Sequence, residues 1–108
     1  MDSYEIIMTE DATADLFGLR DYIVCVLCAP DTALAYIKII RSEIDKLSKA
    51  PKIHKIVSEE PWNSREIRRM NVRNFAIFYR ILEDERRVYI LNIIYKKRDL
   101  SNVLLDLE

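Results

Sequence analysis

Two neighbouring apolar runs in the second half of the chain restrict its fold more than any other feature. They span residues 75–82 and 88–95, and the charged residues between them include the four at 83–86. Side chains in each run alternate as they do along a strand, which predicts an antiparallel hairpin. Both faces of this hairpin carry apolar residues, so we expect it at the centre of a sheet that is covered on both sides.

Basic residues gather around this hairpin. Residues 52–98 hold 12 Lys and Arg against 6 Asp and Glu, whereas residues 1–51 hold 5 against 9 and residues 99–108 hold none against 3. The net charge of -1 therefore conceals one cationic segment between two acidic ones. Such an arrangement suits a polyanion or an acidic protein partner better than a neutral small molecule.

The length and the composition predict one domain that spans residues 1–108. Half of the residues are hydrophobic, which is enough for a single modest core and too little for two. The N-terminus shows no signal-peptide pattern, and no run reaches the roughly 20 apolar residues that a membrane span needs. We therefore expect a cytoplasmic protein.

The two cysteines predict neither a metal site nor a redox centre. Cys25 and Cys28 lie inside the apolar run 22–29, and His54 is the only histidine. A structural zinc ion needs four ligands, so these residues are too few. A redox pair normally begins a helix and gives its thiols polar access. We expect two reduced cysteines in the core, with no metal and no cofactor.

The first half of the chain predicts a strand followed by two helices. Residues 4–8 form a short β-like run, and Thr9 is a candidate N-cap for a helix that extends to about residue 28. Residues 29–31, Ala-Pro-Asp, interrupt it, since proline cannot continue a helix but suits the first turn of the next. Apolar residues at helical spacing then predict a second helix to about residue 50. The two helices should form an antiparallel hairpin that covers one face of the sheet.

The remaining segments complete an α+β fold. Residues 52–59 are an ambiguous strand, residues 60–64 a loop and residues 65–72 a third strand, and Asn74 stands where a tight turn favours positive φ. The predicted fold is an N-terminal strand and an antiparallel helical hairpin packed on a three- to four-stranded antiparallel sheet. The second sheet face, being partly cationic, is left for a ligand or partner.

The order of these segments resembles a known protein family. The helical hairpin reads DYI, APDTALAYI and IDKLSKAP, and the strands read IRRMNVRNFAIFYRI and VYILNIIYKKRDL. The most specific part is the pattern R-x-x-V-x-N-F-x-I-x-Y-R over residues 69–80, paired with Arg98 and Asp99 after the last strand. Over residues 4–104 the sequence is similar to the RelE/ParE superfamily of bacterial type II toxin-antitoxin toxins.

The resemblance implies a small toxic effector of a plasmid-stabilisation module, which arrests growth and is held inactive by an antitoxin that wraps around it. Two mechanisms occur on this fold. RelE-like members cleave mRNA in the ribosomal A site, and ParE-like members poison DNA gyrase. The fold cannot choose between these mechanisms, so the side chains must be weighed.

Several side chains on or near the sheet are candidates for RNA cleavage. Cleavage without a metal needs positive charge at the scissile phosphate and groups that move protons. By position the resemblance assigns Arg98 to phosphate contact, with Arg69 and Arg73 on or beside the third strand. Tyr95 and His54 are the candidate proton carriers. Further candidates for binding a target or partner are Lys52, Lys55, Trp62, Arg68, Arg80 and Lys97.

Two departures from the family pattern favour gyrase inhibition. Asn71 stands where RNA-cleaving members tend to have an arginine, and Leu104 where they have a C-terminal tyrosine. The long apolar helical hairpin also resembles the ParE-like branch, which acts by binding and needs no catalytic tyrosine. We therefore expect ParE-like inhibition of gyrase. A RelE-like mRNA endonuclease and an inactive binding module stay as alternatives.

Trp62 permits two interpretations. As an aromatic residue in a proline-flanked loop beside a cationic sheet, it could stack on a base or fill an antitoxin pocket. It could instead close the edge of the core beneath the loop, which is the interpretation we favour. Arg80 likewise has a structural alternative to binding, an ion pair with Glu66.

Overall fold

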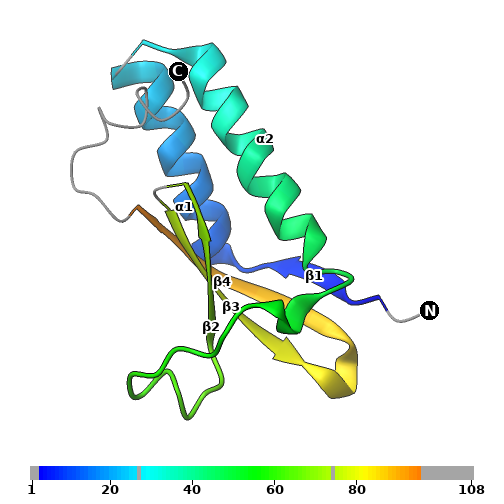
Figure 1. The fold of residues 1–108 in the computed structure, drawn as a ribbon. Coiled ribbons are helices and arrows are strands. Elements are labelled where there is room, and N and C mark those ends of the chain that lie inside the picture. Colours follow the sequence, from blue (N-terminus) through cyan, green and yellow to red (C-terminus); the bar gives the residue numbers. More distant parts are fainter. Residues whose placement is uncertain (1–2, 27, 74, 96–108) are drawn as a thin grey trace.

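The computed structural model describes residues 3–26, 28–73 and 75–95. It has the α+β architecture predicted from the sequence, with two helices packed on one face of a four-stranded sheet (Figure 1). The elements in chain order are β1 (Glu5–Met8), α1 (Glu10–Asp21), a π-helical segment (Tyr22–Val26), α2 (Pro30–Lys46), a short 3-10 helix (Pro51–Ile53), β2 (Arg68–Val72), β3 (Phe75–Leu82), a 3-10 turn (Glu83–Glu85) and β4 (Arg87–Tyr95).

The sheet has the strand order β1-β4-β3-β2 and is mixed rather than antiparallel throughout. Strands β2, β3 and β4 form the predicted antiparallel meander. Strand β1 instead runs parallel to β4, with Glu5 opposite Arg87 and Met8 opposite Ile90. A parallel pair needs a long connection between its two strands. The helical hairpin and strands β2 and β3 lie between β1 and β4 in the chain, so the connection is long enough for this pairing.

Helices α1 and α2 form an antiparallel hairpin over one face of the sheet (Figure 1). Thr9 caps α1, as predicted: its side-chain oxygen accepts a hydrogen bond from the backbone N–H of Ala12 and its hydroxyl donates to the carbonyl of Ile90. The hydroxyl therefore fixes the start of α1 on β4. Between helices and sheet, Tyr36, Phe75 and Tyr79 are the largest fully buried side chains.

The link between the helices differs from the prediction. The α-helical part of the first helix ends at Asp21, and the π-helical segment continues it to Val26. Cys25 and Cys28 are both free and exposed, so the expectation of two core cysteines is wrong. The π-helix has more residues per turn than an α-helix, so the apolar run turns relative to the sheet and only Ile23 of the π-helical segment is buried.

The turn between β2 and β3 places its positive φ at Arg73, with φ 56°. Asn74, predicted for that role, lies outside the described residues. Strand β2 begins at Arg68, three residues later than predicted, after Glu66 takes a φ of 57°. Of the ambiguous segment 52–59, Ile56 forms an isolated antiparallel bridge with Arg68. This segment therefore borders part of the outer edge of β2.

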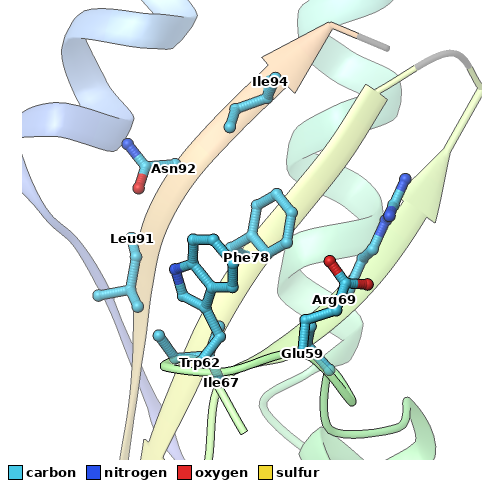
Figure 2. Close-up of a pocket in the computed structure, with 9 residues that line it drawn as sticks. Glu59, Trp62, Ile67, Arg69, Phe78, Leu91, Asn92 and Ile94 are labelled. Carbon is cyan, nitrogen blue, oxygen red and sulfur yellow. The ribbon is translucent and has the colours of Figure 1, made fainter. Parts of the chain in front are cut away.

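Only one face of the sheet is fully covered, contrary to our expectation for the central hairpin. Phe75, Ile77 and Tyr79 of β3 face the helices and are buried. On the other face Phe78 is half-buried, and Ile94 of β4 is 49% exposed. The loop that carries Trp62 lies over part of this second face (Figure 2). The remaining apolar surface there is the starting point for the functional site.

Candidate functional site

A cleft of about 370 Å³ lies on the sheet face opposite the helices. Figure 2 shows it with the indole of Trp62 lying over the sheet beside Phe78, Asn92 on one side and Arg69 on the other. Two ionisable groups, Arg69 and Glu59, belong to its lining. The residues that line it are Val57, Glu59, Trp62, Ile67, Arg69, Phe78, Leu91, Asn92 and Ile94.

An irregularity in the β3–β4 pairing shapes the floor of the cleft. Phe78 pairs with Asn92 and Tyr79 pairs with Ile90, so Leu91 has no partner on β3. A β-bulge of this kind puts one extra residue into one strand and bends it. Leu91 and Asn92 therefore both reach the cleft, although they are sequence neighbours.

The opposite wall comes from the segment that pairs with β2. The backbone N–H of Val57 donates to the carbonyl of Ile67, and the N–H of Arg69 donates to the carbonyl of Lys55. Residues that face each other in an antiparallel pair share a side of the sheet. Val57, Ile67 and Arg69 all line the cleft, so Lys55, opposite Arg69, lies on the same side.

Trp62 is 44% exposed, so it does not close the edge of the core, and the interpretation favoured from sequence is wrong. Its loop is held by local hydrogen bonds. The side-chain amide of Asn63 donates to the carbonyl of Val57 at 3.0 Å, and the N–H of Ile67 donates to the carbonyl of Trp62 at 3.1 Å. These bonds fix the backbone that carries the indole, and the indole itself is partly exposed to solvent.

Arg69 is held from two sides at the edge of the cleft. Its Nε donates to Oδ1 of Asn71 at 3.1 Å, and its guanidinium carbon lies 5.8 Å from the centre of the Phe78 ring. Its side chain is exposed. Within the described residues no carboxylate forms an ion pair with Arg69, so its positive charge is available to an incoming anionic group.

Two other predicted binding residues make contacts within the chain. A guanidinium nitrogen of Arg68 donates to the carbonyl of His54 at 2.7 Å, which ties the 3-10 segment to β2. Lys52 forms an ion pair with Glu83 at 2.9 Å. The hydrogen bond between them raises the pKa of Lys52 and lowers the pKa of Glu83. Neither side chain lines the cleft.

The remaining predicted residues divide into those near the cleft and those away from it. Arg80 is exposed and follows Phe78 by two residues on β3, so it lies on the cleft side; among the described residues it makes no ion pair with Glu66. Arg73 lies in the β2–β3 turn. The ring of Tyr95 packs at a tilt against the ring of Phe75, with 5.0 Å between the ring centres, on the helix side. Lys97, Arg98 and Leu104 lie outside the described residues.

His54 packs edge-on against Tyr79, with 6.4 Å between the ring centres. The hydroxyl of Tyr79 donates to the carbonyl of Pro51 at 2.6 Å, and burial raises the pKa of Tyr79 to about 12. Both rings therefore belong to the packing that fixes residues 51–54. This location does not favour His54 as a proton carrier at the cleft.

Five residues of the cleft were not predicted from the sequence as parts of a site: Phe78, Leu91, Asn92, Ile94 and Glu59. The hairpin pattern did show apolar residues on both strand faces, and we took them as evidence for a second cover. The same pattern also fits an apolar surface that awaits a partner. The bulge at Leu91 gives no sequence signal that we could have used.

A second apolar surface lies on the helical hairpin, away from the cleft. A groove of about 240 Å³ runs between α1, α2 and β1, and Phe17 and Arg41 are among its lining residues. Phe17 is 50% exposed, and Leu34, beside a shallower groove on α2, is 53% exposed. The guanidinium of Arg20 lies over the Phe17 ring at 4.8 Å. The molecule therefore presents apolar surface on both of its layers.

Two features are absent from the part of the chain that the structure describes. No three metal-binding side chains gather at one place in residues 3–26, 28–73 and 75–95. In the same residues, no helix has both the length and the apolar composition needed to cross a membrane.

Comparisons with known proteins agree with this architecture. The model of a family described as the ParE toxin of type II toxin-antitoxin system, parDE, matches residues 6–100. No curated protein matches the chain.

Several solved structures share the fold. A structure of the chromosomal ParDE system from P. aeruginosa superposes with a TM-score of 0.72 at 22% identity, covering 90% of this chain and 100% of that one. The RelBE2 toxin-antitoxin complex from Mycobacterium tuberculosis superposes with a TM-score of 0.62 at 21% identity, covering 92% of this chain and 97% of that one. The isolated E. coli RelE toxin superposes with a TM-score of 0.64 at 11% identity, covering 98% of this chain and 100% of that one.

Proposed function

Because the chain belongs to the ParE toxin family of type II toxin-antitoxin systems, we propose that it arrests growth by inhibiting DNA gyrase and that a cognate antitoxin neutralises it. The family match over residues 6–100 carries this proposal. The action takes place in the cytoplasm, where gyrase works on the chromosome.

The chemistry of the cleft supports binding over catalysis. RNA cleavage needs a base and an acid within reach of the reacting oxygens. Among the described residues, Glu59 is the cleft's one carboxylate, and no histidine or tyrosine lines it. Tyr95 packs against Phe75 on the opposite side of the sheet. An exposed apolar cleft with one arginine suits a protein contact.

The antitoxin is expected to be acidic and apolar and to contact two surfaces. One is a cationic surface to which we assign Arg69, Arg73 and Arg98; the structure describes the first two, at the cleft and in the β2–β3 turn. The other is the helical hairpin, where Phe17 and Leu34 leave apolar surface exposed. A helix that lays an apolar stripe into a groove is a common way to cover such a surface.

Controlled expression tests the toxin assignment. Expression of the chain alone should arrest growth, and co-expression of the small antitoxin encoded next to it should restore growth. The purified chain should then inhibit supercoiling by gyrase in vitro, and the antitoxin should reverse this inhibition. Normal growth without the antitoxin would contradict the toxin assignment and favour an inactive binding module.

Exchange of Arg69 and Arg98 together for alanine tests the cationic surface. Folding should be nearly unchanged, since exposed cations contribute at most about 1 kcal/mol each. Growth arrest should weaken, because the target loses its cationic contacts. The matched control is Lys49→Ala, which removes an exposed cation three residues after the C-terminal end of α2. Full toxicity of the double variant would remove both arginines from the site.

A RelE-like mRNA endonuclease is the second candidate, favoured by the cations on the open sheet face. The test adds the purified chain to ribosomes programmed with a defined mRNA and maps new 5′ ends by primer extension. Cuts at the A-site codon that vanish when Arg98 is changed would establish this activity and displace the gyrase proposal. Intact mRNA from a chain that still arrests growth supports gyrase.

A further inference from the structure

The cleft under Trp62 combines an apolar interior with a cationic border. Trp62, Phe78 and Ile94 give it exposed apolar surface. Arg69 stands at its edge, and Lys55 lies opposite Arg69 in the antiparallel pair, so both cations occupy the same side. An apolar cavity bordered by positive charge selects a ligand that has one large apolar group beside negative charge.

A third cation extends this border. Arg69 pairs with Phe78 on β3, and Arg80 follows Phe78 by two residues, so the side chains of Arg69, Phe78 and Arg80 share one face. Arg80 is exposed. Of these three cations Arg69 lines the cleft together with one carboxylate, Glu59, and Lys55 and Arg80 lie on the same face beyond the lining. The cations on this face belong to residues 52–98, which hold 12 Lys and Arg against 6 Asp and Glu.

The lining favours a peptide side chain over a nucleobase. Four of the lining residues are aliphatic, namely Val57, Ile67, Leu91 and Ile94. Bases prefer flat aromatic walls on which to stack, which a mostly aliphatic lining does not provide. An apolar peptide side chain fits an aliphatic lining, and the carboxylates of neighbouring peptide residues can pair with Lys55, Arg69 and Arg80.

We propose that the cleft beneath Trp62 is a docking site for an acidic segment of the antitoxin, which seats one large apolar side chain between Trp62, Phe78 and Ile94 and places a flanking carboxylate on Arg69. The inference rests on the proposed function for the source of the peptide. The antitoxin thereby covers the same sheet face that carries the candidate effector residue Arg69. It would block the target by direct competition.

Trp62 makes the proposal directly measurable, because it is the only tryptophan in the chain. The probe is the capped pentapeptide Glu-Asp-Leu-Glu-Asp, titrated into the purified chain. Seating the leucine should shift the Trp62 emission to shorter wavelength and saturate. A peptide with serine in place of leucine, and one with four lysines in place of the acids, should each bind at least about tenfold more weakly.

Charge reversal on the protein completes the test. Arg69→Glu should lower the affinity for the acidic peptide about tenfold and raise the affinity for the lysine peptide. Lys49→Glu, at a residue that does not line the cleft, should change neither affinity. The proposal is overturned if the serine peptide binds equally well, or if an oligothymidine competes more strongly than the acidic peptide. An emission shift that follows the concentration of the chain alone would also overturn it, by assigning the cleft to a second copy.

The antitoxin itself is tested with a chain labelled with fluorotryptophan, which gives one fluorine NMR resonance. Adding the unlabelled antitoxin should move this resonance, and the acidic peptide in excess should move it part of the way back. A stable complex that leaves the resonance unmoved would overturn the assignment to the antitoxin. Absence of growth arrest would contradict the proposed function alone, since the peptide titration does not require toxicity.

Discussion

Four non-glycine residues, Cys28, Glu66, Arg73 and Arg86, adopt left-handed backbone conformations with φ between 54° and 57°. This region costs L-residues roughly 1 kcal/mol or more, and glycine enters it freely. All four residues end a helix, a loop or a turn. The chain contains a single glycine, Gly18, which lies within α1. Residues with side chains therefore occupy these positive-φ positions, at a steric cost.

Cys28→Gly should therefore stabilise the protein. Cys28 is exposed and makes the turn before α2 with φ 54°, where the N–H of Ala29 donates to the carbonyl of Ile23. Relief of the left-handed strain should exceed the added entropy of the unfolded chain and raise the unfolding free energy by about 0.5–1 kcal/mol. The control is Cys25→Gly, inside the π-helical segment; this change should lower the unfolding free energy by about 1 kcal/mol. Urea unfolding measures both, and a destabilised Cys28→Gly variant would contradict the assignment.

Tyr79 predicts a loss of stability in alkaline solution. Its folded pKa of about 12 lies above the ordinary value of 10.0, because the ring is buried. The folded state therefore holds the phenol proton more tightly than the unfolded state does. This contribution is fully present below pH 10 and is lost as the pH rises from about 10 to about 12, with a total of about 3 kcal/mol. Tyr79→Phe should flatten this part of the stability curve relative to wild type, and parallel curves would contradict the prediction.

At the scale of elements, the hairpin of β3 and β4 and both helices could be predicted because apolar periodicity marks each of them. The bulge at Leu91, the parallel pairing of β1 and the π-helical segment could not. Each depends on contacts between distant segments, such as the bond from Thr9 to Ile90. The candidate site follows the same division: Trp62 and Arg69 were recognisable as residues, whereas the bulge and the pairing of Lys55 with Arg69 decide which residues meet.

Asp15 illustrates such a contact between elements. Strand β4 continues beyond the end of β1, and there the backbone N–H of Ile93 donates to Oδ2 of Asp15 on α1 at 2.9 Å. Asp15→Ala should cost about 1–2 kcal/mol, because it leaves a backbone donor without its partner. Asp15→Asn keeps an acceptor and should cost less. Urea unfolding and hydrogen exchange of the Ile93 amide measure the effect; equal stability of the two variants with unchanged exchange would show that α1 and β4 do not depend on this bond.

At the scale of the whole molecule, two separate surfaces lie on opposite layers. The sheet layer carries the cleft with Arg69, and the helical layer carries the exposed Phe17 and Leu34. A target that needs only the sheet face and an antitoxin that spans both layers would make toxicity and neutralisation separable by mutation. The charge segregation has the same consequence, since the cationic segment belongs mainly to the sheet layer.

Phe17→Ser combined with Leu34→Ser should separate the two activities. Both side chains are about half exposed, at 50% and 53%, so their loss should leave the fold intact. Growth arrest should persist, whereas affinity for the antitoxin should fall at least about tenfold, because interface energy concentrates in large apolar side chains. Val26→Ser is the control: Val26 is 60% exposed at the end of the hairpin and lines neither groove. Calorimetric titration with the antitoxin measures the affinity, and a double variant that the antitoxin still neutralises at wild-type concentrations would place the antitoxin on the sheet face alone.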